Sequence, residues 1–249
     1  MKPRELPAAT ISEQDGVRYL HLDSPWVQGA MFLRAPDVIV LEYVQRMMAA
    51  LLWRPSARLS RGHAVQLGLG AATITRFCHR VLRMERVTAV ELNPGVIAAC
   101  RHGFRLPRND ERLSVIQADA AGWVADPARR GTADLLHVDL YDQDAAAPVL
   151  DSAEFYAHCR GLLADGGVMA VNLFGRHSSF SRSAGHIAAA FGADRVWSLT
   201  PTREGNTIVV AACEAAIPGR EELLDRAAHL EREHGLPARK WLRMVRPYS

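Results

Sequence analysis

A glycine-rich turn with an acidic residue beyond it is the pattern in this sequence that most clearly indicates chemistry. Residues 65–73 read Val-Gln-Leu-Gly-Leu-Gly-Ala-Ala-Thr, and Glu91 ends another apolar run about two dozen residues later. Glycines allow the backbone to approach a ligand closely, and an acid at the next strand end can accept hydrogen bonds from two ribose hydroxyls. We therefore predict a nucleoside site that contains Gly68, Gly70 and Glu91.

Two more acids follow apolar runs further along the chain. Asp119 comes just after the run 113–117, and Asp139 ends a later run. The carboxyl ends of parallel strands meet at one edge of a sheet, so both acids should lie near Glu91. Asp119, with Ala120 beside it, is suited to bind the amino group of an adenine, although an aspartate there is also a good N-cap for a following helix.

A second carboxylate, Asp142, stands three residues after Asp139. Two close carboxylates on a loop favour a cationic amine, and a carboxylate partly removed from water can accept a proton from that amine. The alternative is an aspartate pair that only caps the loop. The pair therefore indicates either an amine site beside the nucleoside site or a structural loop cap.

The surrounding sequence indicates which elements position these residues. A chain of 249 residues that is 49% hydrophobic suits one α/β domain with a small appendage. From His63 onward, strands that are apolar on both faces alternate with helical stretches, which is typical of a parallel sheet covered by helices. We predict strands at 64–68, 87–91, 113–117, 133–139, 167–173, 194–199 and 206–212, and helices at 72–82, 94–102, 120–126, 152–163 and 180–191.

The last two predicted strands are separated only by the turn 201–205, so we expect an antiparallel hairpin at the edge of the sheet. Five parallel strands with a terminal hairpin predict an α/β, Rossmann-like sheet of seven strands, of the AdoMet-dependent methyltransferase type. We assign residues 61–213 to this nucleoside-binding domain. The preceding residues 1–60 should form a small region with a β-hairpin and one helix.

Residues 214–249 should form a helical tail, because Leu223, Leu224 and Leu230 repeat at helical spacing. We expect the basic run 239–246 to belong to a helix with a solvated basic face.

Composition excludes several other classes of protein. The net charge is only +3, and there is no aromatic RNA-binding signature or zinc-finger spacing, so nucleic acid is not an expected partner. The four cysteines lie far apart without a C-x-x-C pair, which indicates free thiols and neither a zinc site nor a redox pair. No run approaches 18 apolar residues and the N-terminus lacks an apolar leader, so we expect a cytoplasmic protein without a membrane span.

Together these motifs resemble the spermidine synthase, or polyamine aminopropyltransferase, family over roughly residues 16–213. The family pattern is a glycine-rich loop, an acid ending the second strand, an Asp after the third strand, and D-x-x-D. Here those elements are residues 68–70, Glu91, Asp119 and residues 139–142. The family's S-x-E-F-Y helix start and glycine turn follow as Ser-Ala-Glu-Phe-Tyr at 152–156 and Asp-Gly-Gly at 165–167. Plain methyltransferases rarely combine these with D-x-x-D.

The resemblance implies transfer of an aminopropyl group from decarboxylated S-adenosylmethionine to an amine, with release of methylthioadenosine and without a metal. It implies that Asp139 is the general base and that Asp142 binds the amine. Tyr43 stands one residue from the position of a family tyrosine, and Gln45 matches the glutamine of the family's Y-Q-E-M stretch. Glu91 and Asp119 would hold the ribose and the adenine, and a homodimer is expected.

Two departures from the family pattern concern the substrate, besides Val44 at the position of the family tyrosine. Ala71 stands where the family has an Asp that contacts the amino group of the donor, and Arg203 stands where a family turn supplies a tyrosine to the amine site. If Arg203 points inward, it disfavours a diamine by like-charge repulsion and favours a carboxylate. The strand that usually precedes the family's N-terminal hairpin is not recognisable in this sequence.

Two other functions stay open. One is an AdoMet-dependent methyltransferase on the same scaffold, with intact S-adenosylmethionine as donor, which Ala71 makes more credible. The other is a catalytically silent family member that acts as a binding module. The retention of both Asp139 and Asp142 argues against the silent protein, because a binding module has no physical reason to keep a buried carboxylate pair.

Overall fold

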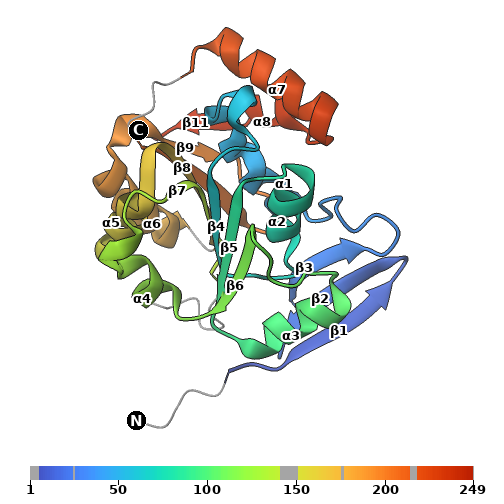
Figure 1. Cartoon of the computed structure of the whole chain (residues 1–249). Coiled ribbons are helices and arrows are strands. Elements are labelled where there is room, and N and C mark those ends of the chain that lie inside the picture. Colours follow the sequence, from blue (N-terminus) through green and yellow to red (C-terminus); the bar gives the residue numbers. More distant parts are fainter. Residues whose placement is uncertain (1–5, 25, 141–150, 175–176, 214–217, 249) are drawn as a thin grey trace.

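Two β-sheets of different size organise the chain (Figure 1). The computed structural model describes residues 6–24, 26–140, 151–174, 177–213 and 218–248. A three-stranded antiparallel sheet contains β1 (Ala9–Gln14), β2 (Val17–Leu22) and β3 (Val27–Phe32). The main sheet contains β4 (His63–Leu67), β5 (Arg86–Glu91), β6 (Leu113–Gln117), β7 (Ala133–Val138), β8 (Leu163–Phe174), β9 (Val196–Leu199), β10 (Asn206–Ala212) and β11 (Val245–Pro247).

The strand order of the main sheet is β11-β9-β10-β8-β7-β4-β5-β6. Strands β8, β7, β4, β5 and β6 are parallel, whereas β10 is antiparallel to both β8 and β9. The seven predicted strands, the parallel core and the antiparallel hairpin are therefore confirmed, but an eighth strand, β11, lies outside the hairpin at the edge of the sheet. Strand β4 lies between β5 and β7, so the strand order reverses there and a crevice opens at the carboxyl ends of β4 and β7.

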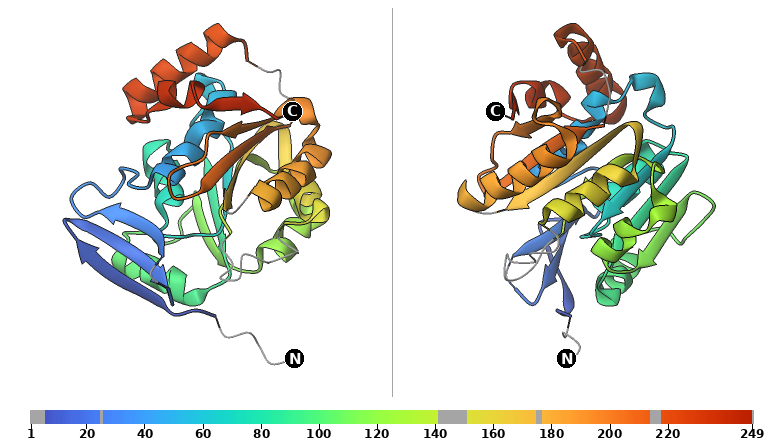
Figure 2. Two further views of the ribbon diagram at one scale, coloured as in Figure 1. Left: turned by 180° about the vertical axis from the view of Figure 1, so that it is seen from behind. Right: turned by 90° about the vertical axis from the view of Figure 1, so that its left-hand side faces the viewer.

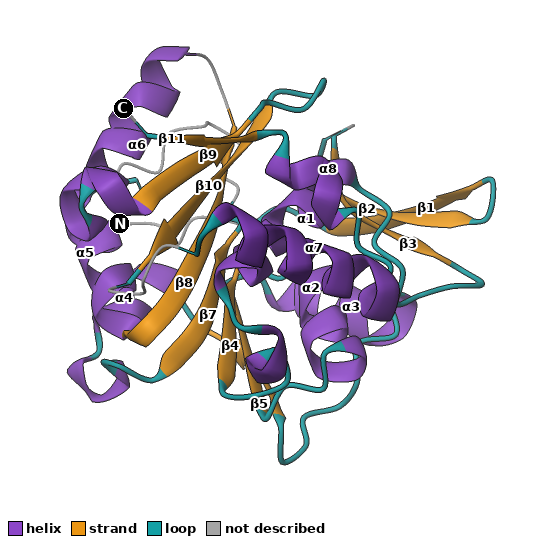
Figure 3. Ribbon diagram, turned by 90° about the horizontal axis from the view of Figure 1, so that it is seen from above, coloured by secondary structure: helices purple, strands orange, loops and turns teal. Residues whose placement is uncertain are grey.

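Helices cover both faces of the main sheet (Figure 3). One face packs against α1 (Glu42–Met47), α2 (Thr73–Arg76), α3 (Pro94–Gly103), α7 (Arg220–His234) and α8 (Ala238–Leu242). The other face packs against α4 (Ala120–Ala125), α5 (Ala153–Leu162) and α6 (His177–Phe191). Short 3₁₀ segments are η1 (Met48–Trp53), η2 (Ser56–Arg58), η4 (Pro127–Arg129) and η5 (Ala193–Arg195), and η3 (Phe77–Val81) is a π-helical segment that follows α2.

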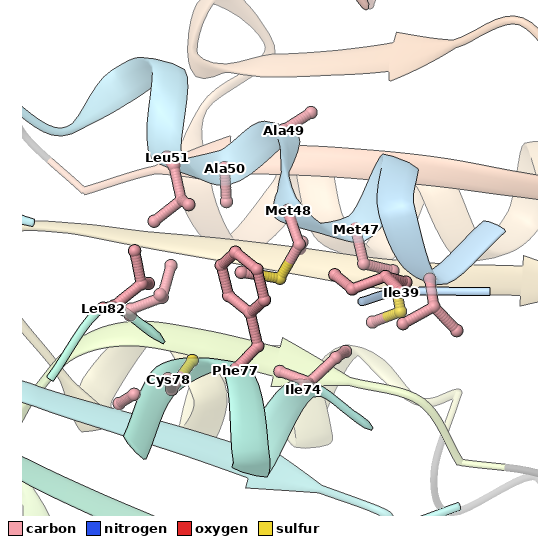
Figure 4. Packing of buried hydrophobic residues seen from close by; sticks show 14 of the residues in the cluster. Ile39, Met47, Met48, Ala49, Ala50, Leu51, Ile74, Phe77, Cys78 and Leu82 are labelled. Carbon is pink, nitrogen blue, oxygen red and sulfur yellow. The ribbon is translucent and has the colours of Figure 1, made fainter. Parts of the chain in front are cut away.

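The most deeply buried part of the core lies where the N-terminal helical segment crosses the sheet. Residues 47–52 are all fully buried, which explains why this stretch is apolar on every side. Figure 4 shows Met48 of η1 and Phe77 of η3 facing one another, with Leu51 and Leu82 beside them. This packing fixes α1, and with it Tyr43, over the sheet.

The ends of the chain differ in two ways from the sequence-based expectation. Strand β1 precedes the predicted hairpin and pairs with β2, although its residues are mostly exposed and therefore gave no apolar signal. The run 239–246 is not one helix, so that prediction was wrong: α8 ends at Leu242 and β11 pairs with β9. The cause is tertiary, because Trp241 is fully buried and Val245 lies opposite Leu199.

Figure 2 shows the three-stranded sheet and α7 at opposite ends of the molecule. Within the described residues, no helix is both long enough and apolar enough to cross a membrane. The four cysteines are buried and free, as their spacing indicated.

The contact between the glycine turn and β7 gives a first prediction. Gly68 has φ of +83°, and a Cβ there would lie 2.1 Å from the backbone oxygen of Asp139. Gly131 also has a positive φ of +65°, but a Cβ there meets no atom within 4 Å. Gly131→Ala should cost about 1–2 kcal/mol of unfolding free energy, from backbone strain alone. Gly68→Ala should cost clearly more, because the backbone must also move.

Urea unfolding of the two variants tests this difference, with the unchanged chain as reference. Equal losses in the two variants would show that the Gly68 contact with β7 does not constrain the turn.

Candidate active site

A cavity of about 890 Å³ opens at the carboxyl ends of the parallel strands. Its walls come from the glycine turn, the ends of β5 and β7, the start of α4 and α5, and the outer part of β8. Seven of the predicted site residues line it, namely Tyr43, Gly68, Gly70, Glu91, Asp119, Ala120 and Asp139. The structure therefore brings residues that are up to 96 positions apart in the chain to one crevice.

Glu91 anchors the glycine turn from the end of β5. Its Oε2 accepts the Leu69 N–H at 2.9 Å, and its Oε1 accepts the Asn93 N–H at 2.8 Å. Burial raises the pKa of Glu91, although these backbone hydrogen bonds lower it in part. Each carboxylate oxygen can accept a second hydrogen bond in addition to the one from the backbone. Glu91 can therefore hold the turn and still accept hydrogen bonds from two ribose hydroxyls.

Asp119 caps a helix, which is one of the two roles that the sequence left open, and it also lines the cavity. Its Oδ2 accepts the Gly122 N–H at 2.8 Å, so the side chain is the N-cap of α4. The same residue is exposed and lines the cavity next to the buried Ala120. The helix cap fixes one carboxylate oxygen and leaves the rest of the group facing the cavity. An adenine amino group is the ligand that we predict for it.

Asp139 lies directly after β7, and its N–H donates to the Leu67 carbonyl at 2.9 Å. The Asn172 Nδ2 on β8 donates to Asp139 Oδ1 at 2.9 Å, and the Tyr43 hydroxyl also donates to this carboxylate. Burial raises the pKa of Asp139 above its usual value, while the hydrogen bonds from Asn172 and Tyr43 lower it in part. The result is a fixed carboxylate of increased basicity at the cavity wall.

A second, water-sized cavity of about 10 Å³ lies between the glycine turn and β3. Its described wall is neutral except for Asp139, because its polar side chains are those of Gln28, Tyr43, Gln66 and Thr73. Ala71 also lines it. The space beside Ala71 is narrow, since a Cβ on Gly29 would lie 2.5 Å from the Ala71 Cβ. This region therefore has no carboxylate at position 71 and little space for one.

Two of the predicted site residues, Gln45 and Arg203, do not line the described cavities. Gln45 donates its Nε2 to the Ile39 carbonyl at 2.8 Å and thereby braces the start of α1. Arg203 is exposed on the β9–β10 turn and is not part of the cavity wall. Asp142 lies outside the described residues. The binding roles assigned to these three residues stay predictions.

Sequence reasoning missed several residues of the cavity wall. Gln28 lines both cavities from β3, and Asn172 holds the Asp139 carboxylate. Gln66 is buried, and its Oε1 accepts a hydrogen bond from the Thr75 hydroxyl. A signal was present in the sequence, because Gln66 and Asn172 are amides inside otherwise apolar strands. Within the residues that the structure describes, no group of three or more His, Cys, Asp or Glu side chains could hold a metal ion.

The geometry of Glu91 gives a second prediction. Glu91→Gln replaces one acceptor oxygen by an amide nitrogen, so one ribose hydroxyl or one backbone N–H loses its partner. The affinity for methylthioadenosine should fall at least tenfold, since a hydrogen bond to a charged group contributes about 1.5–3 kcal/mol.

Calorimetric titration with methylthioadenosine measures this change, and Glu111→Gln, an exposed acid that does not line the cavity, is the matched control. Unchanged affinity in a folded Glu91→Gln protein would mean that Glu91 only anchors the turn.

Comparison with known proteins places this geometry in a family. A family model described as the spermine/spermidine synthase domain matches residues 68–221. A polyamine aminopropyltransferase of Chromobacterium violaceum is 32% identical over 232 residues, covering 93% of this chain and 86% of the relative. A polyamine aminopropyltransferase of Neisseria meningitidis serogroup A is 31% identical over 237 residues, covering 95% and 88%.

Solved structures show the same fold. A probable spermidine synthase from Corynebacterium glutamicum superposes with a TM-score of 0.73 at 21% identity, over 92% of this chain and 85% of that one. Human methyltransferase-like protein 13, solved in complex with SAH, gives a TM-score of 0.69 at 22% identity, over 78% and 92%. The likeness expected from the motifs is thus confirmed over most of the sequence, and the chain belongs to the spermine/spermidine synthase family.

Proposed function

We propose that this protein transfers an aminopropyl group from decarboxylated S-adenosylmethionine to an amine. The observation that supports this most directly is the position of Asp139, a fixed and partly desolvated carboxylate beside the glycine turn. A base there lies next to the predicted nucleoside site and faces the same cavity. The family relationship supports the same reaction, because the relatives are named polyamine aminopropyltransferases.

The charge of the cavity also suits cationic substrates. Five carboxylates line its described wall, those of Glu91, Asp119, Asp139, Asp151 and Glu204, against one guanidinium, that of Arg182. Arg182 itself lies 3.6 Å from Asp151. Such a cavity attracts a sulfonium and an ammonium and repels carboxylates. The charge balance therefore favours an amine acceptor over the carboxylate acceptor that Arg203 would have indicated.

The reaction needs alignment and one proton transfer. The lone pair of the neutral amine attacks the donor's methylene carbon that is bonded to sulfur, and the carbon–sulfur bond breaks. The bonding pair moves onto sulfur, so the positive sulfonium leaves as the neutral thioether methylthioadenosine. The new nitrogen–carbon bond makes the nitrogen positive, and Asp139 takes a proton from the attacking nitrogen. Tyr43 and Asn172 hold the Asp139 carboxylate in place for that transfer.

A methyltransferase that uses intact S-adenosylmethionine is the second candidate. Ala71 favours methyl transfer, because position 71 has no carboxylate that could repel the carboxylate of intact S-adenosylmethionine. Thermal stabilisation by the two donors distinguishes the candidates. Aminopropyl transfer predicts stronger stabilisation by the decarboxylated donor, and methyl transfer predicts the reverse. The homodimer expected from the resemblance stays a prediction, which analytical ultracentrifugation would check.

The third prediction concerns the base. Asp139→Asn should lower turnover at least 100-fold, because general-base catalysis contributes about 10²–10⁴-fold. Methylthioadenosine binding should persist, since Glu91 and the glycine turn are intact. Thermal stability at neutral pH should not fall. A raised pKa means that the neutral carboxyl stabilises the fold at low pH, and this contribution is lost as pH rises through the raised pKa.

Aminopropyl transfer assays and calorimetry with methylthioadenosine test these outcomes together. Retained turnover in Asp139→Asn would remove Asp139 as the base, even if every ligand still bound.

The fourth prediction concerns pH. Asp139 accepts a proton only when it is ionised, so kcat/KM should fall on the acidic side as pH drops through its raised pKa. The Tyr43 hydroxyl stabilises the ionised form, and its removal in Tyr43→Phe should raise this pKa further. The acidic limb of the kcat/KM profile should therefore move to higher pH in Tyr43→Phe. A limb caused by titration of the free amine would keep its position, and that result would contradict the assignment.

A further inference from the structure

The turn between β9 and β10 carries two exposed charged residues, Arg203 and Glu204. The buried Thr202 fixes the turn, because its N–H donates to the Asn206 carbonyl at 2.8 Å and its carbonyl accepts the Gly205 N–H at 3.2 Å. Both charged side chains are exposed, but only that of Glu204 is part of the cavity wall. The residue of this turn that faces the substrates is therefore an acid.

Glu204 has no ion-pair or hydrogen-bonding partner among the residues that the structure describes. The one guanidinium in the described cavity wall, that of Arg182, is instead within 3.6 Å of Asp151. An uncompensated carboxylate at the edge of a cavity is free to bind a cationic group of a ligand.

Phe174 lies between this carboxylate and the proposed base. The register of β8 and β10 pairs Phe174 with Asn206, and a Cβ on Gly205 would lie 3.6 Å from the Phe174 ring. Phe174 lines the cavity and is 52% exposed, which is high for a large apolar side chain. The strip from Asp139 to Glu204 is therefore acidic at each end and apolar in the middle.

Asn172 marks the inner end of this strip. It stands two residues before Phe174 on the same face of β8, so the two side chains are separated by about 7 Å along the strand. Its Nδ2 is bonded to Asp139, but its Oδ1 is buried without a hydrogen-bonding partner among the described residues. A buried unsatisfied acceptor calls for an N–H donor. An acceptor amine at Asp139 supplies one.

We propose that Glu204 is a specificity-determining residue that binds a second cationic nitrogen of the acceptor. The reacting nitrogen lies at Asp139 and Asn172, the methylene chain crosses the Phe174 ring, and the distal ammonium meets Glu204. The inference rests on the proposed amine transfer and adds to it which end of the cavity selects the acceptor. It also assigns the substrate contact of this turn to Glu204, where the sequence alone had suggested Arg203.

The experiment compares Glu204→Gln with Arg203→Gln, which changes the adjacent charge outside the cavity wall. The acceptors are linear α,ω-diamines of three to six carbons, each paired with the monoamine of equal chain length. In the unchanged protein, the best diamine should have a KM at least tenfold below that of its monoamine. Glu204→Gln should raise the diamine KM about tenfold, from loss of one partly solvated ion pair, and leave kcat and the monoamine KM unchanged.

A second variant, Phe174→Ala, should raise KM for diamine and monoamine alike, because it removes the apolar contact that both share. The proposal is overturned if Glu204→Gln affects the two amine classes equally or neither, or if Arg203→Gln produces the same selective loss.

Amine binding to the protein saturated with methylthioadenosine, measured by calorimetry, separates this inference from the reaction itself. A Glu204-dependent preference for diamines without any aminopropyl transfer would contradict the proposed function and support the role of Glu204. Transfer to diamines and monoamines with equal KM in the unchanged protein would support the proposed function and contradict the role of Glu204.

Discussion

The close approach of the glycine turn to the end of β7 is the constraint on which the site depends. The strand order reverses between β4 and β7, so the two strands lie side by side while their following segments diverge. Gly68 sits so near Asp139 that no side chain fits between them. This contact places the turn proposed to bind a nucleoside beside the carboxylate proposed as the base, and every proposed chemical step uses that proximity.

The two central acids are both buried but differ in their hydrogen-bonding partners. Glu91 and Asp139 both have a raised pKa because they are desolvated, and both are held by hydrogen bonds from the protein. The partners of Glu91 are backbone N–H groups of the turn and of residue 93, which make it an anchor for a neutral ligand. Those of Asp139 are two side chains, which hold a carboxylate that must exchange a proton. The proposed binding role of Glu91 and the proposed catalytic role of Asp139 therefore rest on their different partners.

The small N-terminal sheet contributes to this site as well. Gln28 of β3 reaches both cavities, and Gly29 lies against Ala71 of the turn. A larger residue at position 29 or at position 71 would push the three-stranded sheet away from the glycine turn. The alanine at position 71 and the close packing of β3 are thus two aspects of one arrangement, which leaves the end of the cavity next to β3 neutral apart from Asp139.

Local patterns in the sequence determined the order of strands and helices, the nucleoside turn and the acids at the strand ends. Those features depend on spacing within one element, so periodicity and residue type reveal them. Only the tertiary structure decided that the basic run 239–246 divides into a helix and an edge strand, because Trp241 is buried and Val245 pairs with β9. It likewise decided that Glu204 belongs to the cavity wall and that Arg203 does not, although both are exposed. The direction of a side chain on a turn depends on hydrogen bonds and on residues far away in the chain, such as Phe174.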